Sequence, residues 1–351
     1  LRPVLARQME VYAGFMEHTD HHVGRLLDAL KDLGVMDDTL IYVMIGDNGA
    51  SAEGTVNGTF NEMLSLNGAG SLETVEFMAS KIDLFGTPAA YNHYAVGWAH
   101  ALDTPYQWTK QVASHWGGTR NGTVVHWPNG IKAKGEIRNQ FHHVIDVAPT
   151  ILEAAGLPQP VMVNGVQQQP YEGVSMSYSF EDPQAPDRHE TQYFEMYVNR
   201  GIYHKGWTAV TKHSTPWPTP GGLNLPAYDD DKWELYAPDD WTQAHDLARE
   251  LPDRLYALQR QFLIEATKYN ALPLDDRRPE RFNSELVGRP VLIRGKSQLL
   301  FSGMGRLGEN VVLNTKNKSY AVTAEVVLSA GSANGVIAAI GGGSGGWSLY
   351  T

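Results

Sequence analysis

An apolar run that ends abruptly in polar residues constrains this chain more than any other feature. Residues 40–45, LIYVMI, are all apolar or aromatic, and Gly46 then precedes Asp47-Asn48-Gly49. Such a run without polar alternation predicts a strand buried on both faces, as in a parallel sheet covered by helices. Ligands of these sheets bind at the carboxyl ends of the strands. The side chains of Asp47 and Asn48 therefore lie where an α/β enzyme has its chemistry.

The composition limits both the partners and the chemistry. The net charge is −11 and no cluster of lysine and arginine occurs, which argues against nucleic acid or an anionic membrane as partner. No apolar run reaches the roughly eighteen residues of a membrane span, so we expect none. The absence of cysteine excludes a disulfide, a thiolate zinc site and a cysteine nucleophile within these residues. Any metal ion must then be held by oxygen or imidazole ligands.

The first half of the chain alternates helical and strand-like patterns. Apolar residues recur at three- and four-residue spacing over residues 6–33, which predicts a helix ending at Gly34. Residues 123–127 predict a second strand, and residues 141–156 a helix with Asp146 as its N-cap. This order is typical of an α/β domain.

Between these elements lies a long irregular segment, residues 51–109. It is rich in glycine, asparagine, threonine and aromatic residues, and only residues 72–81 predict a short helix. A long connection of this kind is usually functional or disordered, and its aromatic content argues against disorder. We expect an ordered lid or a substrate-binding excursion.

The second half has a different pattern. A loop rich in proline and glutamine, residues 158–186, marks the first expected boundary. The pattern beyond it predicts a small antiparallel sheet with one helix; its strands are expected at 191–198, 206–212 and 233–236, with a turn at 199–205 and the helix at 252–269. A charged linker, 275–290, and short strand-like runs at regular spacing from residue 291 follow. The expected domains are therefore 1–187, 188–274 and 291–351, with 275–290 as linker.

Five motifs in this order resemble the sulfatase family of the alkaline phosphatase superfamily, and specifically the long bacterial arylsulfatase type. They span roughly residues 1–275 and comprise Asp-x-x-Val-Gly-x-Leu-Leu at 20–27, Asp-Asn-Gly at 47–49, Lys110 before Gly-Gly-x-Arg at 117–120, Asp-x-x-Pro-Thr at 146–150 and Trp-Glu-Leu-Tyr at 233–236. The resemblance implies an α/β fold with an alkaline-phosphatase-like sheet flanked by helices over residues 1–187. A small antiparallel-sheet subdomain and a truncated, β-sandwich-like accessory region would follow.

The resemblance also implies an activity and a set of site residues. Members of the family hydrolyse sulfate esters with a formylglycine made from the Cys or Ser of a Cys/Ser-x-Pro-x-Arg motif, beside a bound Ca²⁺. Carried over by motif, Asp47 and Asn48 would be ligands of Ca²⁺, or of Mg²⁺ in its place, and Lys110 would bind the sulfate. His115, between Lys110 and Gly117, is a further catalytic candidate.

Besides the spacing of Lys110 and Gly117, which is seven residues here and six in many relatives, the chain departs from the family pattern in one important respect. It has no cysteine and no Ser-x-Pro-x-Arg sequence. The chain also begins at Leu1 inside an expected helix. We therefore expect a fragment that lacks the N-terminal part, with the formylglycine and two further carboxylate ligands lying before Leu1.

Other interpretations of these residues remain open. Asp47-Asn48-Gly49 also has the residue types that favour a simple turn. An isolated lysine such as Lys110 is usually exposed to solvent. His115 is as well suited to a structural role as to a catalytic one. A phosphodiesterase or phosphonate hydrolase of the same superfamily, or a non-catalytic degenerate sulfatase, are the alternative functions. The expected partner is a small-molecule sulfate ester. The oligomeric state, and the choice between periplasm and cytoplasm, stay open.

Overall fold

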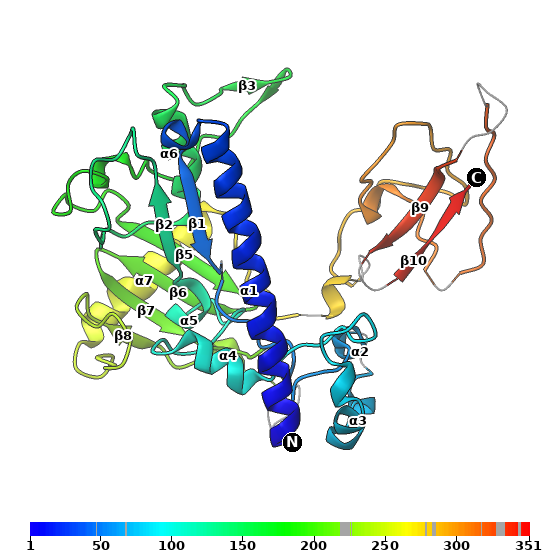
Figure 1. Ribbon diagram of the computed structural model, residues 1–351, viewed down its shortest axis with the longest axis horizontal. Coiled ribbons are helices and arrows are strands. Elements are labelled where there is room, and N and C mark those ends of the chain that lie inside the picture. The colour runs from blue at the N-terminus through cyan, green and yellow to red at the C-terminus, as the bar shows by residue number, and fades with distance from the viewer. Residues whose placement is uncertain are drawn as a thin grey trace. The chain divides into compact units, whose positions relative to one another are not determined.

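The computed structural model describes residues 1–46, 48–66, 69–217, 225, 227–277, 279–282, 286–316, 318–327, 334–342 and 345–351. The chain divides into two compact units, Leu1–Leu274 and Asp275–Thr351 (Figure 1). The first unit is a mixture of helices and antiparallel sheets. In the described part of the chain, no helix is both long and apolar enough to cross a membrane.

A single long helix, α1 (Arg2–Asp32), opens the first unit. Its C-terminal end is closed by Gly34, which has a φ of +71°. The Val35 N–H donates to the Leu30 carbonyl oxygen at 3.1 Å, as expected where a left-handed glycine ends a helix. The predicted helix and its glycine end are thus confirmed.

The expected central strand exists, but its surroundings differ from the prediction. β1 (Ile41–Ile45) pairs with β2 (Gly122–His126) in antiparallel register, and Met44 and Ile45 are 46% and 60% exposed. An alkaline-phosphatase-like sheet with a parallel strand buried on both faces is therefore wrong for the residues described here. An apolar run shows what a strand is able to bury, whereas its actual burial depends on the layers that neighbour it.

A four-stranded antiparallel sheet forms the centre of the first unit. Its strands follow one another in chain order; they are β5 (Thr191–Met196), β6 (Asn199–His204), β7 (Trp207–Thr211) and β8 (Glu234–Tyr236). The sheet and its order agree with the small antiparallel sheet expected from the sequence, apart from β6.

The turn predicted at residues 199–205 is wrong, because Asn199–His204 form strand β6. The chain reverses instead in two-residue turns on either side, in which Tyr197, Val198, Lys205 and Gly206 have φ of 50°, 66°, 49° and 86°. Turns with two positive φ angles match the twist of a hairpin and need no extra residues. Tyr197-Val198 lacks the usual Asn-Gly signal for such a turn, so the strand was missed.

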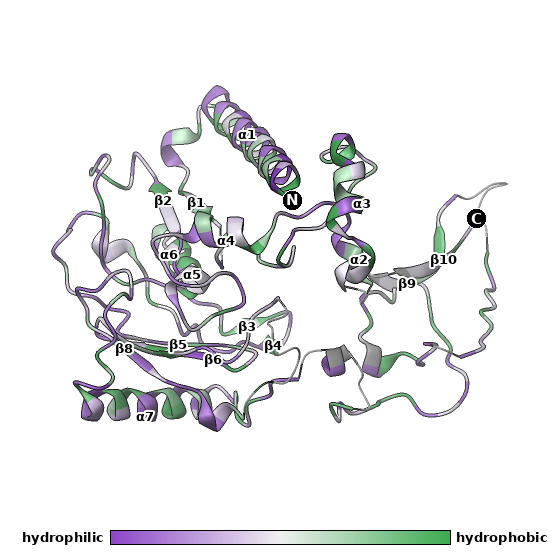
Figure 2. Ribbon diagram, turned by 90° about the horizontal axis from the view of Figure 1, so that it is seen from below, coloured by the Kyte–Doolittle hydropathy of each residue, from purple (hydrophilic) through white to green (hydrophobic). Residues whose placement is uncertain are grey.

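Helix α7 (Pro252–Lys268) covers one face of this sheet (Figure 2). The buried side chains between them form one apolar cluster: Ile202, Ala209, Leu235, Leu258, Phe262 and Ala266. Burying a large apolar side chain stabilises the fold by roughly 1.5–3 kcal/mol. This cluster is the principal core of the first unit.

The opposite face of the sheet supports the segment before α5 (Trp116–Thr119). Asn199 Nδ2 donates to the Gln111 carbonyl oxygen at 3.0 Å. A Cβ on Gly201 would lie 2.9 Å from the Ser114 carbonyl oxygen, so the backbones approach closely. The sheet thus acts as a platform for residues 107–116.

The irregular segment of residues 51–109 is packed onto α1. It contains three short helices, α2 (Glu62–Leu66), α3 (Val75–Ser80) and α4 (Val96–Asp103). The buried Gln8 binds it twice, donating to the Asn57 carbonyl oxygen at 2.9 Å and accepting from the Ala95 N–H at 3.1 Å. These contacts agree with the expectation that the segment is ordered.

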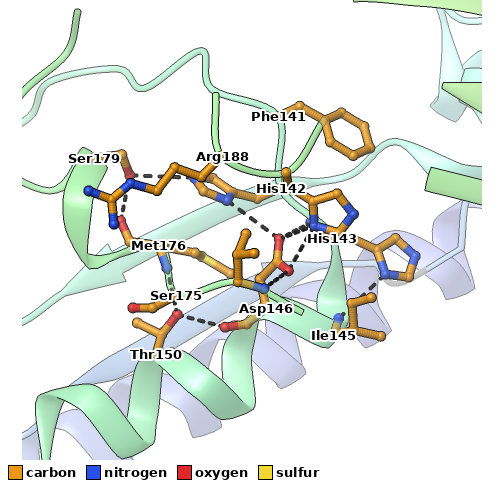
Figure 3. A network of polar contacts seen from close by, with 12 residues as sticks. Phe141, His142, His143, Ile145, Asp146, Thr150, Ser175, Met176, Ser179 and Arg188 are labelled. Atoms are coloured by element: carbon orange, nitrogen blue, oxygen red, sulfur yellow. Dashed lines mark hydrogen bonds and ion pairs between the residues drawn. The ribbon is translucent and has the colours of Figure 1, made fainter. Parts of the chain in front are cut away.

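The Asp-x-x-Pro-Thr motif holds a neighbouring loop in place (Figure 3). Asp146 precedes α6 (Val147–Ala154) and is completely buried. Its side chain accepts from the Val174 N–H at 2.8 Å, and Thr150 Oγ1 accepts from the Met176 N–H at 2.9 Å. The motif therefore binds residues 174–176 through their backbone. A side-chain N-cap for α6, as expected for Asp146, is absent from its described contacts.

Histidines complete the surroundings of the buried carboxylate (Figure 3). His189 Nδ1 lies 2.8 Å from Asp146 Oδ1, and His142 Nδ1 lies 3.5 Å from Asp146 Oδ2. Burial alone raises the pKa of Asp146, but the bonds from His142, His189 and two backbone N–H groups outweigh it and hold the pKa well below its usual range. Asp146 is therefore a charged structural hub.

The second unit contains one hairpin in its described residues, β9 (Val336–Gly342) paired antiparallel with β10 (Gly345–Tyr350). These strands were expected. The other strands predicted from residue 291 onward are not formed in residues 291–316 and 318–327. In the first unit, β3 (Met162–Val163) and β4 (Val166–Gln167) form a further short hairpin.

The core between α7 and the sheet predicts a large effect for one substitution. Phe262→Ala should destabilise the protein by about 3–5 kcal/mol, because it removes a buried ring and leaves a cavity. Urea unfolding followed by circular dichroism measures this loss. Leu263→Ala, on the same helix but 50% exposed, is the matched control. Equal effects of both substitutions would contradict the assigned core.

The Asp146 hub predicts a dependence of stability on pH. Because its folded-state pKa is depressed, its contribution is present above the unfolded value of about 4 and is lost as the pH falls further. Asp146→Asn should lower the free energy of unfolding by about 3 kcal/mol at pH 7 and flatten its decrease below about pH 4. Thermal unfolding between pH 7 and pH 3 tests this, with the exposed Asp28→Asn as control. An unchanged acid profile would refute the hub.

Candidate functional site

Two of the sequence motifs are interlocked through their glycines. Gly49 ends Asp-Asn-Gly and has a φ of +82°; a Cβ there would lie only 1.9 Å from the Gly117 carbonyl oxygen. Gly117 opens Gly-Gly-x-Arg, and a Cβ on it would lie 2.2 Å from the Trp108 carbonyl oxygen. No side chain fits at either position. The motifs at 47–49 and 117–120 therefore meet by direct backbone contact.

Asn48, one of the two residues expected to bind metal, lies at this junction. Asn48 is exposed directly after β1, and Asp47 lies outside the described residues. The backbone beyond them is fixed, because the Ala50 N–H donates to Asp103 Oδ1 at 2.9 Å. Partial burial raises the pKa of Asp103 to about 6, although its bond from Ala50 lowers it.

Lys110 is carried by a strained loop beside the same junction. Its N–H donates to the Ala50 carbonyl oxygen at 3.1 Å. Trp108 and Gln111, on either side, have φ of 67° and 73°. A non-glycine residue with such a positive φ lies in the left-handed backbone region, which costs free energy, and residues of this kind are concentrated at functional sites. The loop thus places Lys110 one hydrogen bond from the segment that follows Asn48.

The ammonium group of Lys110 faces a carboxylate. Its Nζ lies 3.1 Å from Glu53 Oε2, and both side chains are about one-third exposed, at 31% and 32%. Ser51 Oγ lies 2.9 Å from the same oxygen, and Gln111 Nε2 donates to Glu53 Oε1 at 2.6 Å. His93 Nε2 in turn lies 2.9 Å from Ser51 Oγ. One continuous polar network therefore joins the two sides of the junction.

The charge of Glu53 is favoured in this network. Partial burial alone raises its pKa, but the hydrogen bonds from Ser51 and Lys110 outweigh it, so that the pKa lies below its ordinary value. The carboxylate is consequently ionised at neutral pH. Lys110 has a permanent counter-ion within hydrogen-bonding distance.

His115 occupies a different environment. Its ring is completely buried, with Nδ1 2.8 Å from Ser114 Oγ and Nε2 3.1 Å from Glu234 Oε2. Glu234 belongs to β8, so His115 ties the loop to the central sheet. None of its described bonds reaches Lys110 or Asn48, and the catalytic role expected for it stays a prediction.

Arg120, the last residue of Gly-Gly-x-Arg, has described contacts with aromatic residues and not with Lys110 or Glu53. Its Nη1 donates to the Trp241 carbonyl oxygen at 3.2 Å, and its guanidinium lies over the rings of Tyr106 and Trp116. These contacts explain the arginine by packing and cation–π attraction.

Glu53 and Ser51 are members of the site that no sequence motif indicated. Both follow Asp-Asn-Gly within a few residues, and this closeness in sequence is the one feature that could have indicated them. The bond between His93 and Ser51 depends on how residues 51–109 fold back, which local sequence patterns do not indicate.

The donor types at the junction fit a hard cation in part. By residue type, Asp47 has a carboxylate and Asn48 an amide oxygen, and calcium prefers both as ligands. Among the residues with a described position, no group of three or more histidine, aspartate and glutamate side chains is arranged to hold a metal ion. Calcium takes about six to eight oxygen ligands. Asp47 and Asn48 would therefore need further ligands beyond this described set.

Comparison with known proteins adds an independent observation. The sulfatase family model matches residues 3–157, a range that contains the interlocked motifs, Lys110 and Asp146. An uncharacterized sulfatase of Schizosaccharomyces pombe is 33% identical over 155 residues, covering 44% of this chain and 26% of the relative. The arylsulfatase of Klebsiella aerogenes is 30% identical over 175 residues, covering 49% of this chain and 34% of the relative.

A solved structure also matches in part. It comes from work on the metabolism of multiple glycosaminoglycans by Bacteroides thetaiotaomicron and has 16% identity and a TM-score of 0.43, covering 72% of this chain and 43% of the other. The matched region spans about a quarter to a third of the length of the curated relatives. Residues 3–157 of this chain are thus similar to the sulfatase family.

Proposed function

We propose that the protein containing these residues is a sulfuric ester hydrolase of the arylsulfatase type, acting on a small-molecule sulfate ester. The interlock of Gly49 with Gly117 carries this proposal, because it brings the segment that follows Asn48 next to Lys110. The match of residues 3–157 to the sulfatase family supports the same reaction class. Asn48, rather than the histidine often found there in phosphodiesterases of the superfamily, favours sulfate over phosphate.

Asp47 and Asn48 would hold a calcium ion, with magnesium as the alternative. When bound, such an ion polarises an ester oxygen and neutralises negative charge. The oxygen donors supplied by these two residues are of the type that suits it. The exposed position of Asn48 leaves its amide oxygen accessible.

Lys110 would bind the sulfate group. Its ammonium has three N–H donors, of which Glu53 takes one. A fixed positive charge stabilises the negative charge that develops on sulfate or leaving group as the S–O bond breaks. His115 is a weaker candidate because its ring is buried against Glu234.

The nucleophile is proposed to lie outside these residues. The family forms its formylglycine from a Cys or Ser in a fixed motif, and this sequence contains neither cysteine nor Ser-x-Pro-x-Arg. The 351 residues would then supply part of the site: the charge at Lys110 and part of the metal coordination.

Turnover measurements test the proposal directly. The full-length protein should hydrolyse an aryl sulfate faster than the matching aryl phosphate, and Lys110→Ala should lower kcat by about a hundredfold to a thousandfold. Lys134→Ala, at an exposed position, is the control.

The 351 residues alone should release no sulfate. Faster phosphate turnover would favour the phosphodiesterase alternative, and sulfate release by the 351 residues would refute the placement of the nucleophile.

The metal assignment predicts a loss of affinity. In the full-length protein, Asn48→Ala should weaken calcium binding at least about tenfold, since even outer-shell contacts are worth that much. Isothermal titration with calcium measures the change. Asn129→Ala, an exposed asparagine that bonds Asp38, should leave the affinity unchanged. Equal affinities for both variants would remove Asn48 from the ligand set.

A further inference from the structure

We propose that Glu53 is the positioning residue of Lys110. Ser51 bonds the Glu53 carboxylate and thereby helps to fix it, and His93 bonds Ser51 in turn. The inference rests on the proposed function for what Lys110 does, but on geometry alone for how Lys110 is held. Glu53 follows Asp-Asn-Gly in the chain, whereas Lys110 is 57 positions away from it. Their contact joins the two interlocked motifs through side chains as well as backbone.

The carboxylate of Glu53 is itself held by three donors. Oε2 lies 3.1 Å from Lys110 Nζ and 2.9 Å from Ser51 Oγ, and Oε1 accepts from Gln111 Nε2 at 2.6 Å. A carboxylate with both oxygens bonded has little freedom to rotate. It therefore acts as a fixed anchor, whereas a flexible surface glutamate would follow the lysine.

The loop fixes the other end of the lysine. The N–H of Lys110 bonds Ala50 at 3.1 Å, and the positive φ of Trp108 and Gln111 defines the loop on both sides. A lysine side chain has several rotatable bonds, and holding it in one geometry costs conformational entropy. Anchoring both the backbone and the ammonium removes that cost before a substrate arrives.

Ser51 and His93 extend the network. His93 Nδ1 lies 2.9 Å from the Tyr94 carbonyl oxygen, which only accepts, so Nδ1 carries a proton. Ser51 has one proton to donate, either to Glu53 or to His93 Nε2. When Nε2 also carries a proton, His93 donates to Ser51 and Ser51 donates to Glu53. In that arrangement, every group from Tyr94 to Lys110 has a partner.

A second ion pair in the chain offers an internal comparison. Lys205 Nζ and Glu190 Oε2 are also 3.1 Å apart, but these side chains are 58% and 52% exposed. Lys205 lies in the turn before β7, away from the motifs. The two pairs share chemistry and separation, and differ in the surrounding donors.

The experiment is pulse acetylation of the 351-residue chain, with the labelling rate of each lysine read by mass spectrometry. Glu53→Gln should raise the rate at Lys110 about threefold, the size expected for a partly exposed ion pair, and leave Lys205 unchanged. Glu190→Gln should leave Lys110 unchanged. Ser51→Ala, which removes one donor without changing charge, should raise the rate at Lys110 by less than Glu53→Gln does.

Salt separates an electrostatic anchor from a loss of structure. In the natural chain, labelling of Lys110 should rise with ionic strength because salt screens the pair. In Glu53→Gln this dependence should vanish, and Glu53→Asp should retain it in part. An unchanged rate at Lys110 in folded Glu53→Gln, or a salt dependence that persists there, would overturn the proposal.

The full-length protein supplies a second readout. Glu53→Gln should lower kcat for an aryl sulfate about tenfold to a hundredfold, since misplacing a binding group by about 1 Å can have that effect, with KM changed less. Labelling does not depend on turnover. If Glu53→Gln changes the labelling of Lys110 but the natural full-length protein does not turn over an aryl sulfate, only the proposed function is refuted. If the natural protein turns over the ester but Glu53→Gln leaves the labelling of Lys110 unchanged, only the role of Glu53 is refuted.

Discussion

Backbone contact between Gly49 and Gly117 is the constraint on which the rest of the site depends. A Cβ at Gly49 would lie 1.9 Å from the Gly117 carbonyl oxygen, so a side chain there would force apart the end of β1 and the start of α5. The contact brings Asn48 and Lys110 to one junction although they are far apart in the chain. The ion pair of Lys110 with Glu53 joins the same two segments through their side chains.

The central sheet supports the Lys110 side of this junction. The loop of Lys110 rests on the central sheet through Asn199 and through the buried His115, which reaches Glu234 on β8. The sheet is in turn covered by α7 on its other face. Residues of the Asp-x-x-Pro-Thr motif act elsewhere, where Asp146 fixes a neighbouring loop. Both motifs thus have a structural role: Gly-Gly-x-Arg meets Asp-Asn-Gly at the junction, and Asp-x-x-Pro-Thr holds residues 174–176.

Much of the local structure was predictable from the sequence. The apolar periodicity of α1, the glycine at its end and the apolar run of β1 predicted these elements because they depend on neighbours in the chain. The strand β6 was not predictable in this way, since its turns use Tyr197-Val198 in place of a glycine pair. The central parallel sheet was wrong for a different reason, because an apolar run does not specify which strand pairs with it.

The sequence by itself determined the order of the motifs, the absence of a cysteine nucleophile and the oxygen donors for a hard cation. These are properties of residue type and spacing, and they indicated a resemblance to the sulfatase family, whose model matches residues 3–157. Only the tertiary structure decided that β1 pairs with β2, that His115 is buried and that Glu53 faces Lys110. Those facts depend on the path of the chain between distant positions, and local patterns do not encode that path.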